Sequence, residues 1–386
     1  MVRSGTWGTL VLLAFGALSG CIRDFDRSLL EDDGDGCTNC ALTDIGVSGT
    51  LSCALHRDGR LWCWGSNEFG QLGLPEQTNP TRTPQLLPGQ FEHVSTGNDS
   101  AITACAVDDA SGLFCWGAGS SGQAGLGSPR SAEMPTAVGT SLNWTDISVG
   151  VGVSCGVREG ELSCWGWAAE GRLGFMPPGS FQETPARLPI TEPIQAVSVA
   201  RLHGCAVAES GTLWCWGGGD DGRRGYEGPS VPPQQVHGDA RYRSVSTGIQ
   251  HTCGIRDDAS LWCWGDNSLN QLGVDGPGGA MPQRIPEPSA WRTVSAGDDY
   301  TCGITVSDEL YCWGDGRSGR LGLGSTDSAQ RPTRVGELRE WGLVDTGYNH
   351  TCGATRAGQL YCWGGSAMQA NGHGTTVTIP TPVFYE

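Results

Sequence analysis

The sequence contains no lysine, and all 24 of its basic residues are arginine. This absence excludes catalysis through a lysine Schiff base and the lysine of a phosphate-binding loop. Basic residues are also outnumbered by 41 acidic ones, so the formal net charge is −17 at pH 7. Because nucleic acid binding needs a basic surface, nucleic acid is not expected as a partner.

Long apolar runs are also scarce. The one extended run, Thr9–Leu18, follows Arg3 and precedes the small residues Ser19 and Gly20. A run of about ten residues is too short to span a bilayer, which takes about 20. A basic start, a short apolar stretch and small residues are typical of a secretory signal peptide. We therefore predict a signal peptide over residues 1–20.

The end of this segment, Leu18-Ser19-Gly20-Cys21, resembles the lipobox of bacterial lipoproteins. In that family the chain is cut before the cysteine, which then carries the lipid. The resemblance implies that Cys21 is lipidated and anchors the protein to a membrane of the bacterial cell envelope, outside the cytoplasm. The alternative is an ordinary cleaved signal peptide in which Cys21 has no special role.

Residues 21–41 are expected to form an acidic tether. Residues 31–36 are acidic, interrupted by glycine and without apolar periodicity, which indicates a solvated spacer. Calcium binding by these carboxylates is the alternative, although the distal glutamate of an EF-hand is missing. Cys37 and Cys40 form a single C-x-x-C pair. A zinc site would need a second pair, so we predict a local disulfide.

The rest of the chain is a repeat. Glycine is abundant, with 61 residues, and a Cys-Trp-Gly triplet recurs seven times. The triplets start at Cys63, Cys115, Cys164, Cys215, Cys263, Cys312 and Cys362. Their spacing of 48 to 52 residues is typical of a repeat architecture.

Each repeat contains the pattern of four short strands. A β-branched pivot residue lies about eighteen residues before most triplets, and a proline followed by an apolar stretch closes each unit. The pivots are Ile45, Val94, Ile147, Val197, Val245, Val294 and Val344. Four strands per roughly 50 residues is the pattern of a propeller blade. We predict an all-β fold, a seven-bladed β-propeller over residues 42–386, preceded by the signal peptide and the tether.

The repeat resembles the regulator-of-chromosome-condensation repeats, which form a seven-bladed propeller. The His-Ser/Thr element of that family is present at His251-Thr252 and His350-Thr351, and in part at His203-Gly204. Other repeats have different residues there. We interpret these histidines as hydrogen-bonding residues that stabilise turns, not as ligands.

Fourteen cysteines occur as two per repeat. The pairs are Cys53/Cys63, Cys105/Cys115, Cys155/Cys164, Cys205/Cys215, Cys253/Cys263, Cys302/Cys312 and Cys352/Cys362. A hairpin with a three-residue loop places residues ten apart opposite each other, and a two-residue loop does so for residues nine apart. Cysteines opposed in this way lie close enough for a disulfide, and an exported chain favours oxidation. We predict seven disulfides within the blades. The alternative is fourteen buried thiols.

No residue is predicted to be catalytic, to hold a cofactor or to bind a metal. The seven histidines are scattered without ligand spacing, and no zinc-protease motif occurs. Carboxylates from different blades could converge at the central channel and form an unrecognised hydrolase or lyase site, which stays an alternative.

Three residues depart from the repeat where a contact surface could form. Trp167 stands where other repeats have small or acidic residues, and Arg224 follows Arg223 where an apolar residue is usual. Because Trp and Arg are common interface anchors, we predict that Trp167, Arg223 and Arg224 form part of a binding surface. Neutral variation in loops is the alternative.

These observations predict a non-enzymatic, lipid-anchored scaffold outside the cytoplasm that binds a protein or glycan ligand. We expect a monomer. The resemblance also implies an alternative, guanine-nucleotide exchange on a small GTPase. The uniform repeat length leaves no room for the projecting wedge of such exchange factors, and a signal peptide separates the chain from cytosolic GTPases.

Overall fold

The computed structural model describes residues 41–75, 80–97, 102–177, 179–236 and 238–385. The predicted signal peptide, Cys21, the acidic segment and the Cys37/Cys40 pair lie outside these ranges. No helix in the described part of the chain is long and apolar enough to cross a membrane.

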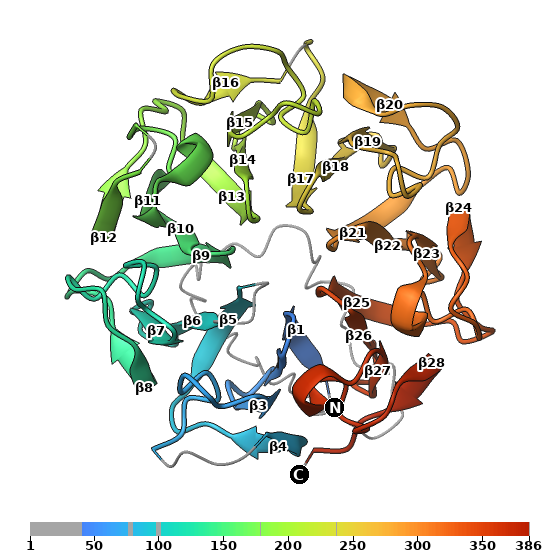
Figure 1. Cartoon of the computed structure of the whole chain (residues 1–386), viewed down its shortest axis with the longest axis horizontal. Coiled ribbons are helices and arrows are strands. Elements are labelled where there is room, and N and C mark those ends of the chain that lie inside the picture. The colour runs from blue at the N-terminus through green and yellow to red at the C-terminus, as the bar shows by residue number, and fades with distance from the viewer. Residues whose placement is uncertain (1–40, 76–79, 98–101, 178, 237, 386) are drawn as a thin grey trace, which may run out of the picture.

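The described residues form seven four-stranded antiparallel sheets arranged around a central axis (Figure 1). The first three blades are β1 (Leu42–Val47), β2 (Leu51–His56), β3 (Leu61–Gly65) and β4 (Thr81–Leu86); β5 (Phe91–Thr96), β6 (Thr103–Asp108), β7 (Leu113–Gly117) and β8 (Ala132–Ala137); β9 (Trp144–Val149), β10 (Val153–Arg158), β11 (Glu161–Trp167) and β12 (Phe181–Arg187). The next two are β13 (Ile194–Val199), β14 (His203–Ala208), β15 (Leu213–Gly217) and β16 (Gln234–Gln235); β17 (Tyr242–Thr247), β18 (His251–Arg256), β19 (Leu261–Gly265) and β20 (Gly279–Arg284). The last two are β21 (Trp291–Ala296), β22 (Tyr300–Thr305), β23 (Leu310–Gly314) and β24 (Ala329–Arg334); β25 (Trp341–Thr346), β26 (His350–Thr355), β27 (Leu360–Gly364) and β28 (Val377–Pro382). Short 3-10 turns occur at η2 (Ala169–Gly171), η3 (Arg317–Gly319) and η4 (Ala367–Gln369). The predicted all-β, seven-bladed propeller is confirmed.

The first strand of each repeat lies innermost and the fourth lies at the rim (Figure 1). Six of the seven rim strands contain a proline within the strand. These prolines are Pro84, Pro135, Pro185, Pro282, Pro332 and Pro380. Proline cannot donate a ladder hydrogen bond, so it protects the exposed edges of the ring against pairing with another chain.

The seven predicted disulfides are present, one in each blade. The paired cysteines are directly opposed in the second and third strands, with Cα–Cα distances of 4.0–4.1 Å. In the third blade, which has the shorter spacing, Glu159 and Gly160 form a two-residue turn with φ values of 53° and 76°. Both positive angles are those of a type I′ hairpin turn, so the missing residue lies in the loop and the pairing is kept.

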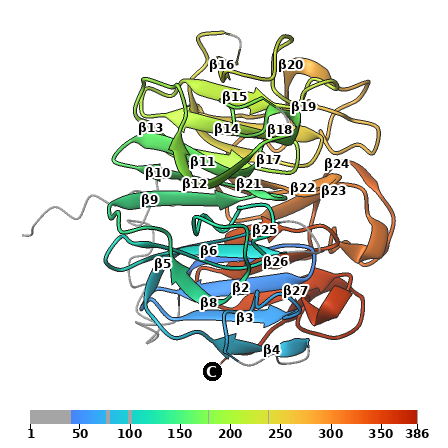
Figure 2. The same ribbon diagram turned by 60° about the vertical axis from the view of Figure 1, so that its left-hand side comes forward.

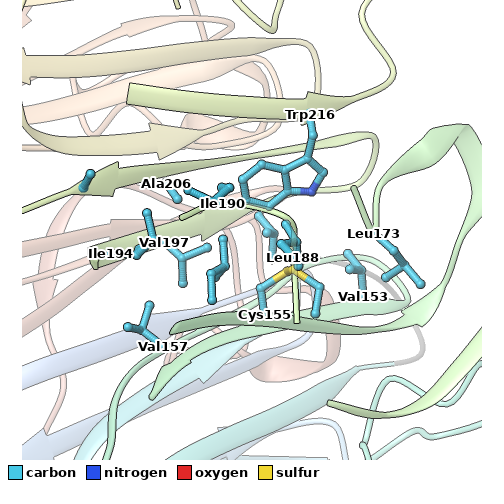
Figure 3. Packing of buried hydrophobic residues seen from close by; sticks show 14 of the residues in the cluster. Val153, Cys155, Val157, Leu173, Leu188, Ile190, Ile194, Val197, Ala206 and Trp216 are labelled. Atoms are coloured by element: carbon cyan, nitrogen blue, oxygen red, sulfur yellow. A yellow bond between two sulfur atoms is a disulfide. The ribbon is translucent and has the colours of Figure 1, made fainter. Parts of the chain in front are cut away.

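Each blade packs on its neighbour through the tryptophan of the triplet. All seven of these tryptophans are fully buried. Each belongs to the same core cluster as the disulfide of the preceding blade. Figure 3 shows this cluster for Trp216, with Leu188 between its ring and the disulfide that contains Cys155. A shared buried core that contains the indole of one blade and the disulfide of the preceding blade therefore joins successive blades.

The ring closes between the first and the last blade without exchanging a strand. β28 pairs with β27, so the final strand stays in the last blade. The two blades lie side by side in both views of the ring (Figures 1 and 2), and β1 contacts β25 and β26. Trp64 of the first blade packs in one cluster with the last disulfide and Val383. The tyrosine ring of Tyr385 lies 5.1 Å from that of Trp62. Closure therefore rests on side-chain packing and hydrogen bonds.

Candidate functional site

The innermost strands of all seven blades line a cavity of about 300 Å³ on the propeller axis. Its walls are the C-terminal halves of these strands and the turns that follow them. The same end of the molecule carries the glycine-rich loops between the third and fourth strands, because connections alternate between the two ends of an antiparallel blade. We call this end the loop face.

A ring of hydrogen bonds joins the blades around the cavity. The residue after the pivot is serine in five blades, and each serine hydroxyl accepts a backbone N–H of the next blade at 2.9–3.0 Å. These serines are Ser95, Ser148, Ser198, Ser246 and Ser295. In the last blade Asp345 takes this place and accepts the N–H of Val47 at 2.7 Å, which closes the ring. The first blade has Gly46 here, so the ring of side chains has one gap.

The residue before the pivot is charged or ionisable in the first three blades. Asp44 accepts the N–H groups of Ile45 at 2.9 Å and of Val94, in the next blade, at 3.0 Å. Asp146 makes the same two bonds, to the N–H groups of Ile147 and Val197, both at 2.8 Å. Between these two aspartates lies His93, whose Nδ1 is 3.7 Å from Oδ2 of Asp44.

The protonation of these groups depends on burial and on their mutual charges. Burial raises the pKa of Asp146, although the charge of His93 opposes this effect. Burial alone would lower the pKa of His93, but the hydrogen bond and charge of Asp44, with the charge of Asp146, raise it. Burial raises the pKa of Asp345 to about 7 against the Val47 and Ser295 hydrogen bonds. Asp345, Asp44 and Asp146 line the cavity from the last, first and third blades. We call this part of the cavity the acidic sector.

Sequence reasoning anticipated that carboxylates could converge at the channel but did not identify them. The available signal was the position of the pivot residue. Asp44 and Asp146 directly precede a pivot and Asp345 directly follows one. Alignment of the repeats on this residue would have found all three.

The predicted binding surface needs a correction. Trp167, at the end of β11, is 40% exposed, but Arg223 and Arg224 are only 7% and 5% exposed. The guanidinium of Arg224 donates to the carbonyl oxygens of Pro229 at 2.6 Å and Gly228 at 2.7 Å. That of Arg223 donates to an oxygen of Asp221 at 2.6 Å. Both arginines hold their own loop in place, so Trp167 is the exposed member of the predicted set.

Trp167 has two neighbours that sequence reasoning missed. It pairs across the sheet with Phe181, which is 53% exposed, and both residues extend their strands at the loop face. The guanidinium of Arg172 lies 4.9 Å from the centroid of the Trp167 ring. Arg172 is itself held by the carbonyl oxygens of Ala169 at 2.9 Å and Val151 at 2.8 Å. Trp167 is thus an exposed aromatic residue whose ring is supported by a fixed cation.

Sequence profiles of the regulator of chromosome condensation (RCC1) repeat match this chain. One matches residues 58–103, 111–157, 258–304 and 307–354, and a second matches residues 42–71, 242–271, 291–320 and 343–374. Together these matches cover more than half of the chain. The chain belongs to the RCC1-repeat family.

Relatives with RCC1-type similarity differ widely in size. Human HERC2, an E3 ubiquitin-protein ligase, is 30% identical over 200 residues, which is 48% of this chain and 4% of HERC2. The mitochondrial RCC1 domain-containing protein RUG3 of Arabidopsis thaliana is 26% identical over 246 residues, 60% of this chain and 53% of RUG3. The matched part of this chain thus spans about half of RUG3 and a small fraction of HERC2. The crystal structure of Prp20p from Saccharomyces cerevisiae superposes with a TM-score of 0.74 at 21% identity, over 88% of this chain and 87% of Prp20p. That likeness shows the fold.

The His-Ser/Thr elements of the RCC1 repeats make hydrogen bonds between blades. The Nε2 atoms of His203, His251 and His350 lie 2.6–2.9 Å from a hydroxyl of the following blade. Burial lowers the pKa of His251 to about 4 and that of His350 to about 3, so both are neutral at pH 7. Their role as hydrogen-bonding residues is confirmed, although the bonds join blades instead of stabilising turns. No group of histidine, cysteine and carboxylate side chains in the described ranges is arranged to bind a metal.

Proposed function

We propose that this RCC1-repeat protein is a non-enzymatic binding scaffold located outside the cytoplasm and anchored to a membrane by a lipid on Cys21. The observation that carries this proposal is the disulfide in every blade. Disulfides form and persist in oxidising compartments and are rare in the cytosol. All fourteen of these cysteines are fully buried, so the disulfides, once formed, are shielded from reductants in solution.

Binding is proposed to occur on the loop face around Trp167. Interfaces are enriched in tryptophan and arginine at their energetic centres. The Arg172 guanidinium orders the Trp167 ring before a partner arrives, which lowers the entropy lost on binding. Phe181 extends the apolar contact area. We propose a protein as the partner, because tryptophan and arginine are enriched at the energetic centres of protein–protein interfaces.

A catalytic role for the cavity is the weaker alternative. Asp44 and Asp146 face the same cavity with His93 between them, as an acid–base site would require. Each carboxylate already accepts two backbone N–H groups, and one of these comes from the next blade. These bonds link blades at the hub and support a structural role.

The test of export uses the full chain with its own first 40 residues in a bacterial host. The expected product is in the membrane fraction, carries lipid at Cys21 and has no free thiols at the repeat cysteines. The Cys21→Ser variant should be soluble, with the disulfides intact. A cytosolic, reduced and unlipidated wild-type product would contradict the proposal.

The test of binding uses the intact protein as bait for envelope and secreted proteins. For the partner recovered, Trp167→Ala should weaken binding about tenfold or more, as expected of a central aromatic contact. Met281→Ala is the matched control, because Met281 is 68% exposed on the rim strand β20. Equal affinity of wild type and Trp167→Ala would place the interface elsewhere.

A further inference from the structure

The cavity on the axis has the size of a small-ligand site. Its volume of about 300 Å³ is at the lower end of the range for ligand pockets, about 300–1,000 Å³. It is continuous with the loop face through the turns after the innermost strands, which include Arg201 and Ile249 among its lining residues.

The charges of the cavity are distributed unevenly. Asp345, Asp44 and Asp146 come from the last, first and third blades, and the fourth to sixth blades contribute serine hydroxyls. Among the described residues, none of these carboxylates forms an ion pair with an arginine, and only His93 lies within ion-pair distance of one of them. Arg201 is exposed and comes from the fourth blade, next to the blade that carries Asp146. The three carboxylates of the acidic sector therefore face one histidine and, among the described residues, no arginine within ion-pair distance.

The carboxylates also have unused acceptor capacity. An ionised carboxylate offers about four lone-pair sites. Asp44 and Asp146 each accept two backbone N–H groups, and Asp345 accepts the N–H of Val47 and the hydroxyl of Ser295. Asp44 also interacts with His93, and Asp345 with the N–H of Thr346. About one or two acceptor sites on each carboxylate thus remain for a donor in the cavity.

A second, independent feature of the lining is an unpartnered hydroxyl. Thr96 lines the cavity, is only 7% exposed, and its Oγ1 has no hydrogen-bond partner among the described residues. The equivalent hydroxyls of Thr247 and Thr346 bond to serines of the preceding blades at 2.9 and 2.7 Å. Thr96 lacks this partner because Gly46 occupies the serine position. A buried hydroxyl with no partner is available to a bound donor.

We propose that this cavity binds a small organic cation with a primary ammonium group, held by Asp44, Asp146 and Asp345. An ammonium has three donors that can reach acceptors on separate blades. A guanidinium is a planar fork that prefers both oxygens of one carboxylate, and here each carboxylate already uses oxygens for backbone bonds. The serine side of the cavity accommodates the rest of the molecule.

The test is calorimetric titration of the full chain with 1,4-diaminobutane at pH 8 and low salt. Butane-1,4-diol is the matched neutral probe. We expect a dissociation constant below about 1 mM for the diamine and no measurable binding of the diol. Absence of diamine binding, or equal binding of the diol, overturns the proposal without any variant.

Variants locate the site. Asp146→Asn keeps the side-chain shape and replaces one of the two oxygens that accept backbone N–H groups with an NH2 group. It removes the charge and should weaken diamine binding about tenfold or more. Asp109→Asn, in an exposed loop, removes the same charge and should leave the affinity unchanged. Trp167→Ala should also leave it unchanged, so this result is separable from the partner-binding test. Equal weakening by Asp109→Asn and Asp146→Asn would indicate attraction to the net charge alone and overturn the proposal.

Discussion

Gly46 leaves one position without a side chain in the ring of hydrogen bonds around the cavity. This position leads to a stability prediction with an internal control. Replacement of Thr96 by valine removes a buried hydroxyl that has no partner in the described chain. The same replacement at Thr346 removes a hydroxyl that lies 2.7 Å from the hydroxyl of Ser295. The two sites are equivalent positions of the second and seventh blades, so the substitution is chemically identical and only the partner differs.

The magnitudes follow from the hydrogen bonds. An unpartnered buried polar group costs about 1–3 kcal/mol, and a typical hydrogen bond contributes about 1 kcal/mol. Valine has nearly the shape of threonine and already occupies this position as Val47, Val149 and Val199. Thr96→Val should therefore stabilise the protein by about 1 kcal/mol. Thr346→Val should destabilise it by about 1 kcal/mol.

The assay is equilibrium unfolding in guanidinium chloride with the disulfides intact, followed by tryptophan fluorescence. The midpoint concentration should rise for Thr96→Val and fall for Thr346→Val, with unchanged slopes. An equal loss of stability in the two variants would mean that the Thr96 hydroxyl has a partner, and the reasoning about the Gly46 gap would be refuted.

Three further predictions concern the covalent and polar links. Replacement of Cys253 and Cys263 together by alanine should lower the free energy of unfolding by about 2–3 kcal/mol, measured by the same assay, since the disulfide closes a short loop; no loss would contradict a stabilising bridge. Burial raises the pKa of Asp345 to about 7 in the folded state, above the ordinary pKa of 3.8. Between these two pH values the Asp345 carboxyl binds a proton in the folded state but not in the unfolded chain. The contribution of Asp345 to stability should therefore increase as the pH falls from 8 to 5, whereas His251 and His350, whose pKa values burial lowers, act in the opposite direction. Asp345→Asn should remove the first contribution, so the stability difference between wild type and this variant should grow as the pH falls, which denaturation at a series of pH values would reveal. Ser52→Ala should cost about 1–3 kcal/mol by leaving the Nε2 atom of His350 unpaired, and His350→Leu in the same chain should recover part of that loss in a double-mutant cycle.

The irregular histidines illustrate why some features could not be predicted from single repeats. Each histidine lies two residues before the first cysteine of its blade. Its partner is the residue that directly precedes the first cysteine of the next blade. The residue pairs at this contact are His203 with Thr252, His251 with Thr301, and His350 with Ser52. In two other blades the histidine position is held by Leu51 or Val153. The partner position of the next blade is then Ala104 or Gly204, respectively, neither of which carries a hydroxyl. The histidines thus follow the residue that they meet in the next blade, and this relation cannot be seen within a single repeat.

The two arginines of the fourth blade are a second example. Their departure from the repeat was visible in the sequence, and it suggested an exposed surface. In the structure Arg224 bonds to the carbonyl oxygens of Gly228 and Pro229 and lies 4.8 Å from the ring of Tyr226. The direction of a long side chain depends on the path of its loop, which composition and spacing do not determine.

The sequence by itself determined the number of blades, the order of strands within each blade and the pairing of the cysteines. These features depend on contacts between residues about ten apart, which strand alternation and turn length specify locally. Only the tertiary structure decided which residues meet at the hub, which polar group there lacks a partner and which departures from the repeat are exposed. Those contacts join residues about 50 or, at the seam, about 300 positions apart, as between Asp345 and Val47, and they exist only once the ring has closed.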